Sequence, residues 1–146
     1  MRALFDVSML LTLFDPGHVM HRAAMTWWQS NRAHGWASCP LSENGFLRII
    51  SQRSYPRPVP LPDALATIQA QVARGGHEFW PDDLSILDAE RINHTRLLGP
   101  AQITDIYLLA LAVRHNGRLV TLDRSMDSTS VRNAAPANIV ILGQAP

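Results

Sequence analysis

The residues of this 146-residue chain best suited to chemistry are four acids in segments that are able to converge: Asp6, Glu43, Asp105 and Asp123. Asp6 stands between two largely apolar segments, residues 3–5 and 8–14, and Asp123 directly follows the apolar run of residues 119–122. A carboxylate in such surroundings is costly without a partner, and open α/β sheets bind ligands at the carboxyl ends of their strands. Together the four acids suggest a site for a divalent metal ion.

Each acid also has an ordinary structural explanation. Glu43 and Asp105 are expected in first helical turns, where the helix dipole favours a negative charge by roughly 0.3–1 kcal/mol. Asp123 could cap a turn beside Arg124. Asp6, in contrast, has no local turn to serve, and both Asp6 and Asp123 end a strand. The joint pattern therefore favours a site, and oxygen ligands of this kind suit Mg²⁺ or Mn²⁺ rather than zinc.

The composition excludes several classes of protein. All 13 basic residues are arginines, and with 12 acids the net charge is +1, so any contact with RNA must be local. A chain without lysine cannot supply the lysine of a P-loop, of a Schiff base or of a phosphoryl-accepting aspartate site. No serine lies in a GxSxG motif, which leaves a Ser-His-Asp hydrolase weakly supported.

The expected location is the cytoplasm. Cys39 is the single cysteine, so no internal disulfide can form, and its expected role is that of a small buried apolar residue. Asp6 and Asp15 interrupt the apolar N-terminal segment and no small-residue cleavage pattern follows, which argues against a signal peptide. No run approaches the roughly 20 apolar residues of a membrane-spanning helix, so no membrane partner is expected.

Predicted strands and helices alternate along the chain. The expected strands cover residues 3–5, 36–39, 78–80, 118–122 and 138–142. The expected helices cover residues 8–14, 18–34, 40–50, 61–74, 85–93 and 106–115, and Thr104 is the expected N-cap of the last one. This order predicts a single domain over residues 1–146, built as a three-layer α/β/α sandwich with a parallel sheet of about five short strands.

Three of these segments resemble those of PIN-domain ribonucleases. LFDVSMLL at residues 4–11 is similar to the opening of that family, ITDIYLLALA at residues 103–112 to its later aspartate-bearing helix, and LVTLDR at residues 119–124 to its last acidic strand. The order and separations fit over nearly the whole chain. Among PIN-like proteins, the compact single-domain form is most similar to VapC toxins of bacterial toxin–antitoxin pairs.

The resemblance implies that the four acids gather at one end of the sheet, hold Mg²⁺ or Mn²⁺ and cleave RNA. It also implies a cognate antitoxin and a homodimer. Thr104 matches the hydroxyl residue that accompanies the third acid. Ser8 stands where the family more often has asparagine, and Ser125 replaces the glycine that commonly follows the last acid.

Two further points remain expectations. The arginines that lie near or follow the site segments are candidates for RNA phosphates, although each could equally be a solvated surface charge: Arg48, Arg53, Arg57 and Arg124. The alternative functions are a non-catalytic PIN-like domain that binds RNA or protein, and a metal-dependent phosphohydrolase that acts on a small phosphate ester. A haloacid-dehalogenase-like phosphatase would need Asp-x-Asp and a later lysine, and this chain has neither after its first strand.

Overall fold

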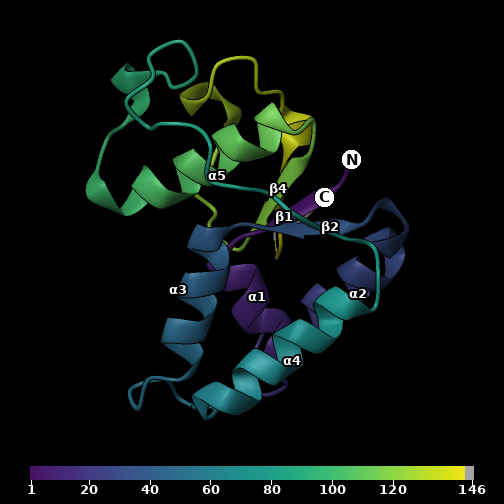
Figure 1. The fold of residues 1–146 in the computed structure, drawn as a ribbon. Coiled ribbons are helices and arrows are strands. Elements are labelled where there is room, and N and C mark those ends of the chain that lie inside the picture. Colours follow the sequence, from purple (N-terminus) through teal and green to yellow (C-terminus); the bar gives the residue numbers. More distant parts are fainter. Residues whose placement is uncertain (144–146) are drawn as a thin grey trace.

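A five-stranded parallel sheet forms the centre of the computed structural model, which describes residues 1–143 (Figure 1). In sheet order the strands are β3 (His77–Phe79), β2 (Trp36–Ser38), β1 (Ala3–Phe5), β4 (Arg118–Thr121) and β5 (Ile139–Ile141). In the register of the central strands, Leu4 lies opposite Ala37 on one side and Leu119 on the other. The predicted parallel sheet is confirmed, with β3 beginning one residue earlier than expected.

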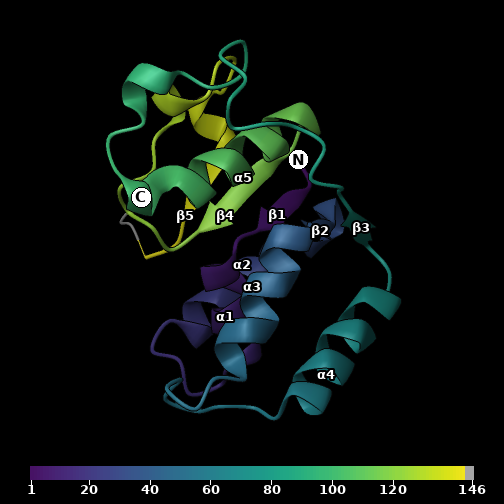
Figure 2. The same ribbon diagram turned by 60° about the vertical axis from the view of Figure 1, so that its left-hand side comes forward.

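Helices cover both faces of the sheet (Figures 1 and 2). One face carries α5 (Ile103–Arg114), and the other carries α1 (Val7–Phe14), α2 (His21–Asn31), α3 (Pro40–Ile50) and α4 (Leu61–Ala73). Short 3₁₀ turns occupy Arg32–His34, His94–Arg96, Pro100–Gln102, Ser128–Ser130 and Pro136–Asn138. The molecule is therefore the three-layer sandwich that the sequence predicted.

Alternation along the strands divides the core into two layers. Leu4 and Leu119 pack with α5, whereas Phe5, Trp36 and Val120 pack with the helices of the opposite face. A strand buried on both faces is apolar at successive positions, which explains the uninterrupted run of residues 3–5. This packing fixes β1 and β4 side by side, and each of these strands leads directly to one of the predicted acids.

A close approach of α1 and α3 depends on Gly45. A Cβ atom at this position would lie 2.6 Å from Val7 Cγ2, a distance at which one of the two helices would have to move. Val7 directly follows Asp6, and Gly45 lies two positions after Glu43. Glycine therefore allows the first turns of the two helices, and with them two of the predicted acids, to lie at the same end of the sheet.

The predicted helix at residues 85–93 is wrong. This segment forms turns, and Ile92 instead makes an antiparallel bridge with Val131. The flanking backbone groups are engaged across the same two segments, because Asn93 N donates to Ser130 O and Arg132 N donates to Arg91 O. Long-range pairing thus takes the hydrogen bonds that a local helix would have needed.

Two predicted helix boundaries also differ from the structure. The helix α5 begins at Ile103 after a 3₁₀ turn, so Thr104 lies inside its first turn and is not its N-cap. The predicted helix over residues 18–34 divides into α2 and the 3₁₀ turn at Arg32–His34, and Gly35 ends it with φ +76°. Among the described residues, no helix has the length and apolar character needed to cross a membrane.

Candidate metal centre

Three of the predicted acids, Asp6, Asp105 and Asp123, line one open pocket of about 410 Å³. Asp6 follows β1, Asp123 follows the neighbouring strand β4, and Asp105 lies in the first turn of α5. The predicted supporting residues Ser8 and Thr104 line the same pocket. The pocket is therefore formed at the carboxyl end of the sheet, as expected for a ligand site in an open α/β fold.

Asp6 is held in place by three donors. Its Oδ1 accepts hydrogen bonds from Ser8 Oγ and Met9 N, both at 2.7 Å, and its Oδ2 accepts one from Thr121 Oγ1 at 2.5 Å. The bond from Met9 N makes Asp6 the N-cap of α1. Burial raises the pKa of Asp6, while the three donors oppose that rise by stabilising the carboxylate.

Thr121 is a site residue that the sequence did not single out. Its buried hydroxyl donates to Asp6 and accepts a hydrogen bond from Asp123 N at 3.0 Å, so it links the first and last acids. Ser8 makes a second link, because its Oγ also accepts from Leu122 N at 3.2 Å. The only signal for Thr121 in the sequence is a polar residue within the apolar run that precedes Asp123.

The carboxyl groups of Asp105 and Asp123 interact, and it is unfavourable for both to be ionised at once. Burial, followed by the negative charges of Asp6 and Asp123, raises the pKa of Asp105 to about 7. Hydrogen bonds from Ser125 Oγ at 2.7 Å and Ser125 N at 2.9 Å lower the pKa of Asp123. A proton shared by this pair therefore resides more readily on Asp105 than on Asp123.

The donor set suits a hard divalent cation. Carboxylate oxygens are the ligands that Mg²⁺ and Mn²⁺ prefer, and no arginine within residues 1–143 forms an ion pair with any of the three aspartates. No three acidic, histidine or cysteine side chains in this part of the chain are already arranged as a metal cage.

Glu43 does not line the pocket of the three aspartates. It lies in the first turn of α3, as predicted, but its Oε2 accepts a hydrogen bond from Ser38 Oγ at 2.5 Å. The same hydroxyl lies 2.7 Å from His77 Nε2. The side chain of Glu43 is thus directed to β2 and β3, and its participation with the other three acids stays a prediction.

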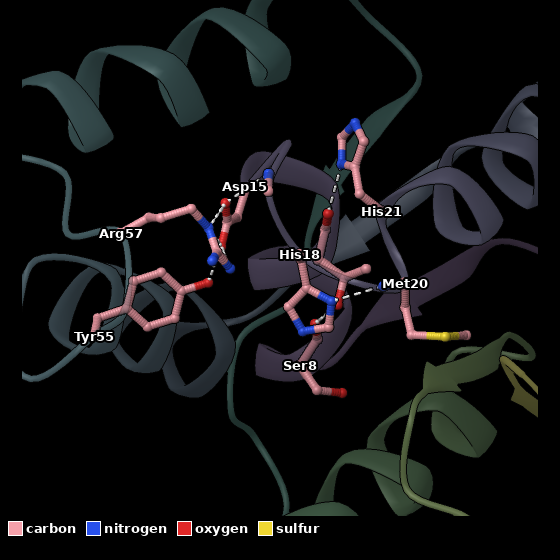
Figure 3. A network of polar contacts seen from close by, with 9 residues as sticks. Ser8, Asp15, His18, Met20, His21, Tyr55 and Arg57 are labelled. Carbon is pink, nitrogen blue, oxygen red and sulfur yellow. Dashed lines mark hydrogen bonds and ion pairs between the residues drawn. The ribbon is translucent and has the colours of Figure 1, made fainter.

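The four arginines proposed for RNA have different surroundings. Arg57 forms a two-pronged ion pair with the buried Asp15, with its Nη2 2.7 Å from Oδ2, and Tyr55 donates to the same oxygen (Figure 3). This network gives Arg57 a structural role at the end of α1. Arg48 and Arg53 are exposed on α3 and after it, and Arg124 Nη2 donates to Gly143 O at 3.1 Å.

Comparison with known proteins adds an independent observation. No protein-family model matches the chain. Three ribonucleases of Mycobacterium tuberculosis are similar over most of their length. Ribonuclease VapC44 is 45% identical over 142 residues, which cover 97% of this chain and 100% of the relative. Ribonuclease VapC39 is 39% identical, covering 89% and 95%, and Ribonuclease VapC38 is 38% identical, covering 83% and 84%. This chain belongs to the VapC ribonuclease family.

The acids of this VapC chain all lie within the similar region. The match to VapC44 covers 97% of this chain and the whole of that relative. VapC membership also agrees with the parallel three-layer architecture and with the resemblance of the three motif segments.

Proposed function

We propose that the protein is a metal-dependent endoribonuclease toxin, which hydrolyses RNA phosphodiester bonds and is neutralised by a cognate antitoxin. The observation that supports this proposal most directly is the meeting of Asp6, Asp105 and Asp123 in one pocket of a VapC chain. Non-catalytic RNA or protein binding is a weaker alternative, because it would not need three buried or half-buried acids that form no ion pair with the described residues.

The residues of the pocket would have different roles in hydrolysis. Asp6, Asp105 and Asp123 would hold Mg²⁺ or Mn²⁺, with Thr121 and Ser8 keeping Asp6 in one orientation. When bound, such an ion neutralises the phosphodiester, lowers the pKa of a bound water and stabilises the leaving oxygen. Asp105 must release its proton before it can serve as a ligand, since only the carboxylate is a good donor. The expected products carry a 5′-phosphate and a 3′-hydroxyl.

RNA phosphates are proposed to meet exposed arginines around the acidic mouth. Arg48, Arg53 and Arg124 remain the candidates, because Arg57 is already engaged by Asp15. Local arginines are necessary because the net charge of +1 gives little long-range attraction for RNA.

A groove of about 390 Å³, lined in equal parts by apolar and polar residues, is the proposed place for the antitoxin. Trp28 and Met25 of α2 line it together with Phe14 of α1, and Arg32 and Arg74 give it positive charge. The aspartates of the site do not line this groove, so an antitoxin would have to extend from it to reach them. A homodimer is proposed from the family resemblance alone.

A purified-protein assay separates the candidate functions. We expect Mn²⁺-dependent cleavage of RNA that EDTA abolishes, and no comparable hydrolysis of a generic phosphate ester. Hydrolysis of the ester with intact RNA would favour the phosphohydrolase, and binding without cleavage would favour the non-catalytic alternative. Co-purification with the product of the adjacent upstream gene tests the antitoxin, and failure to form a complex with it would contradict that part of the proposal.

A further inference from the structure

Glu43 belongs to a hydrogen-bonded chain of three side chains outside the aspartate pocket. Ser38 Oγ lies 2.5 Å from Glu43 Oε2 and 2.7 Å from His77 Nε2. Ser38 is fully buried at the end of β2, His77 begins the neighbouring strand β3, and Glu43 lies on α3. A single hydroxyl therefore joins three elements, two of which, β2 and β3, are far apart in the sequence.

The direction of these hydrogen bonds follows from the number of protons. A serine hydroxyl has one proton and an ionised Glu43 can only accept, so Ser38 Oγ donates to Glu43 Oε2. Ser38 Oγ must then accept the proton of His77 Nε2. The imidazole is held for this bond by the sheet, in which His77 lies opposite Trp36, and by the Trp36 ring, whose centroid is 4.4 Å from that of His77.

We propose that His77 is a positioning residue that acts through Ser38 to fix the conformation of Glu43. This inference rests on the proposed nuclease function, in which Glu43 is the fourth acid. The chain of hydrogen bonds engages Oε2, whereas within residues 1–143 no donor is hydrogen-bonded to Oε1. A carboxylate that is anchored through one oxygen offers the other in a defined direction, which is the purpose of supporting hydrogen bonds behind an active-site acid.

Two amide substitutions at position 77 test the proposal, because the amide nitrogen of each variant takes the place of a different imidazole nitrogen. His77→Gln places an N–H donor near the position of Nε2, whereas His77→Asn places one near Nδ1 and does not reach Ser38. We expect His77→Gln to retain kcat on RNA with Mn²⁺. His77→Asn and Ser38→Ala should lower kcat by about 10- to 100-fold with little change in KM, because they release Glu43 without removing it.

A matched control uses another histidine whose Nε2 makes a hydrogen bond. His94 lies on a 3₁₀ turn and its Nε2 is 2.8 Å from Ile86 O, apart from the chain that holds Glu43. His94→Asn should therefore leave kcat unchanged. Equal kcat for His77→Asn and His77→Gln, with both variants folded by circular dichroism, would overturn the positioning role.

An NMR measurement separates this inference from the nuclease proposal. Imidazole nitrogen shifts of the metal-free protein should report a proton on His77 Nε2, and Glu43→Gln should change those shifts whereas Asp123→Asn should not. A ring without a proton on Nε2, or one unaffected by Glu43→Gln, would overturn the hydrogen-bonded chain. If the wild-type protein never cleaves RNA, the nuclease function is wrong, and the positioning role is wrong with it. The NMR result still shows whether Glu43, Ser38 and His77 are hydrogen-bonded to one another.

Discussion

Asp6 and Asp105 line the same pocket, but the two carboxyl groups differ in their hydrogen-bond donors and in their neighbouring charges. Three donors fix Asp6 as the N-cap of α1. Asp105 has no such donors among the described residues and lies partly buried beside two other acids, which raises its pKa to about 7. Asp105 is therefore an acid of the pocket whose charge changes near neutral pH.

The substitutions Asp6→Asn, Asp105→Asn and Asp123→Asn should each abolish Mn²⁺-dependent RNA cleavage without unfolding the protein. The pKa values of Asp6 and Asp105 are raised, so a neutral amide at either position should leave the metal-free Tm at or above that of the wild type at and above neutral pH. The pKa of Asp123 is lowered by hydrogen bonds from Ser125, so Asp123→Asn should instead lower the metal-free Tm. All three variants should also gain less from added Mn²⁺, because a ligand stabilises the native state according to its affinity. Full activity of Asp6→Asn, or an Mn²⁺ shift in Tm equal to that of the wild type, would show that the proposed metal site is wrong.

The raised pKa of Asp105 also predicts how metal-free stability depends on pH. An ordinary unfolded aspartate has a pKa of about 3.9, so the folded state binds this proton more tightly than the unfolded state does. The contribution of Asp105 to the free energy of unfolding should therefore rise as the pH falls from about 8 through 7 toward 4. Urea unfolding in EDTA, compared between wild type and Asp105→Asn at each pH, isolates this contribution. Identical pH profiles for the two proteins would contradict the assignment.

Sequence reasoning found the acids of the pocket but not the residue that joins them. Asp6 and Asp123 stand out because a carboxylate next to apolar strands is unusual. Thr121 does not stand out, because threonine is an ordinary strand residue and only the pairing of β1 with β4 brings its hydroxyl to Asp6. The orientation of Glu43 was equally hidden, since it depends on Ser38 and on a histidine from another strand.

At the scale of elements, the ion pair of Asp15 with Arg57 ties the end of α1 to the proline-rich connection before α4 (Figure 3). Hydrogen bonds from Arg57 and Tyr55 hold the pKa of Asp15 far below its usual range. The stabilisation is therefore complete above the unfolded pKa of about 4 and is lost as the pH falls further toward the folded value.

The substitution Asp15→Asn should lower the Tm of the protein at neutral pH, by about 2–4 °C for each kcal/mol lost in a domain of this size. It should also flatten the loss of stability between about pH 5 and pH 3. Thermal melts across this range provide the measurement, and Asp63→Asn, on the exposed first turn of α4, is the control. If the variant loses as much stability as the wild type between about pH 5 and pH 3, the proposed role of this ion pair is wrong.

Helices with clear local signals were predicted well, and segments fixed by distant contacts were not. Pro40 begins α3, and Gly35 follows the turn after α2, as their backbone preferences dictate. The segment around Ile92 has weak local signals and was predicted as a helix, yet pairing with Val131 decides its structure. The start of α5 was misplaced because Thr104 has the type of an N-cap, whereas the preceding 3₁₀ turn already carries the chain into the helix.

At the scale of the whole molecule, the alternation of elements indicated a parallel sheet, but it did not determine the order of the strands. The order β3-β2-β1-β4-β5 places β1 between β2 and β4, both of which follow it at a distance in the sequence. This order brings Asp6 next to Asp123, although 116 residues lie between them in the sequence. The position of both acids at strand ends suggested that they could converge, and the family resemblance implied that they meet.

RNA binding should depend on a small number of arginines, because the molecule as a whole is nearly neutral. We expect the double variant Arg53→Ala with Arg124→Ala to bind RNA more weakly in EDTA, where no cleavage occurs, and to keep its Tm. If both side chains contact phosphates of single-stranded RNA, the slope of log affinity against log salt should fall in magnitude by roughly 1.4. The double variant Arg22→Ala with Arg74→Ala removes the same charge from α2 and from the end of α4, and it should leave that slope unchanged. Equal losses in the two double variants would show that only net charge matters and would remove Arg53 and Arg124 from the proposed RNA surface.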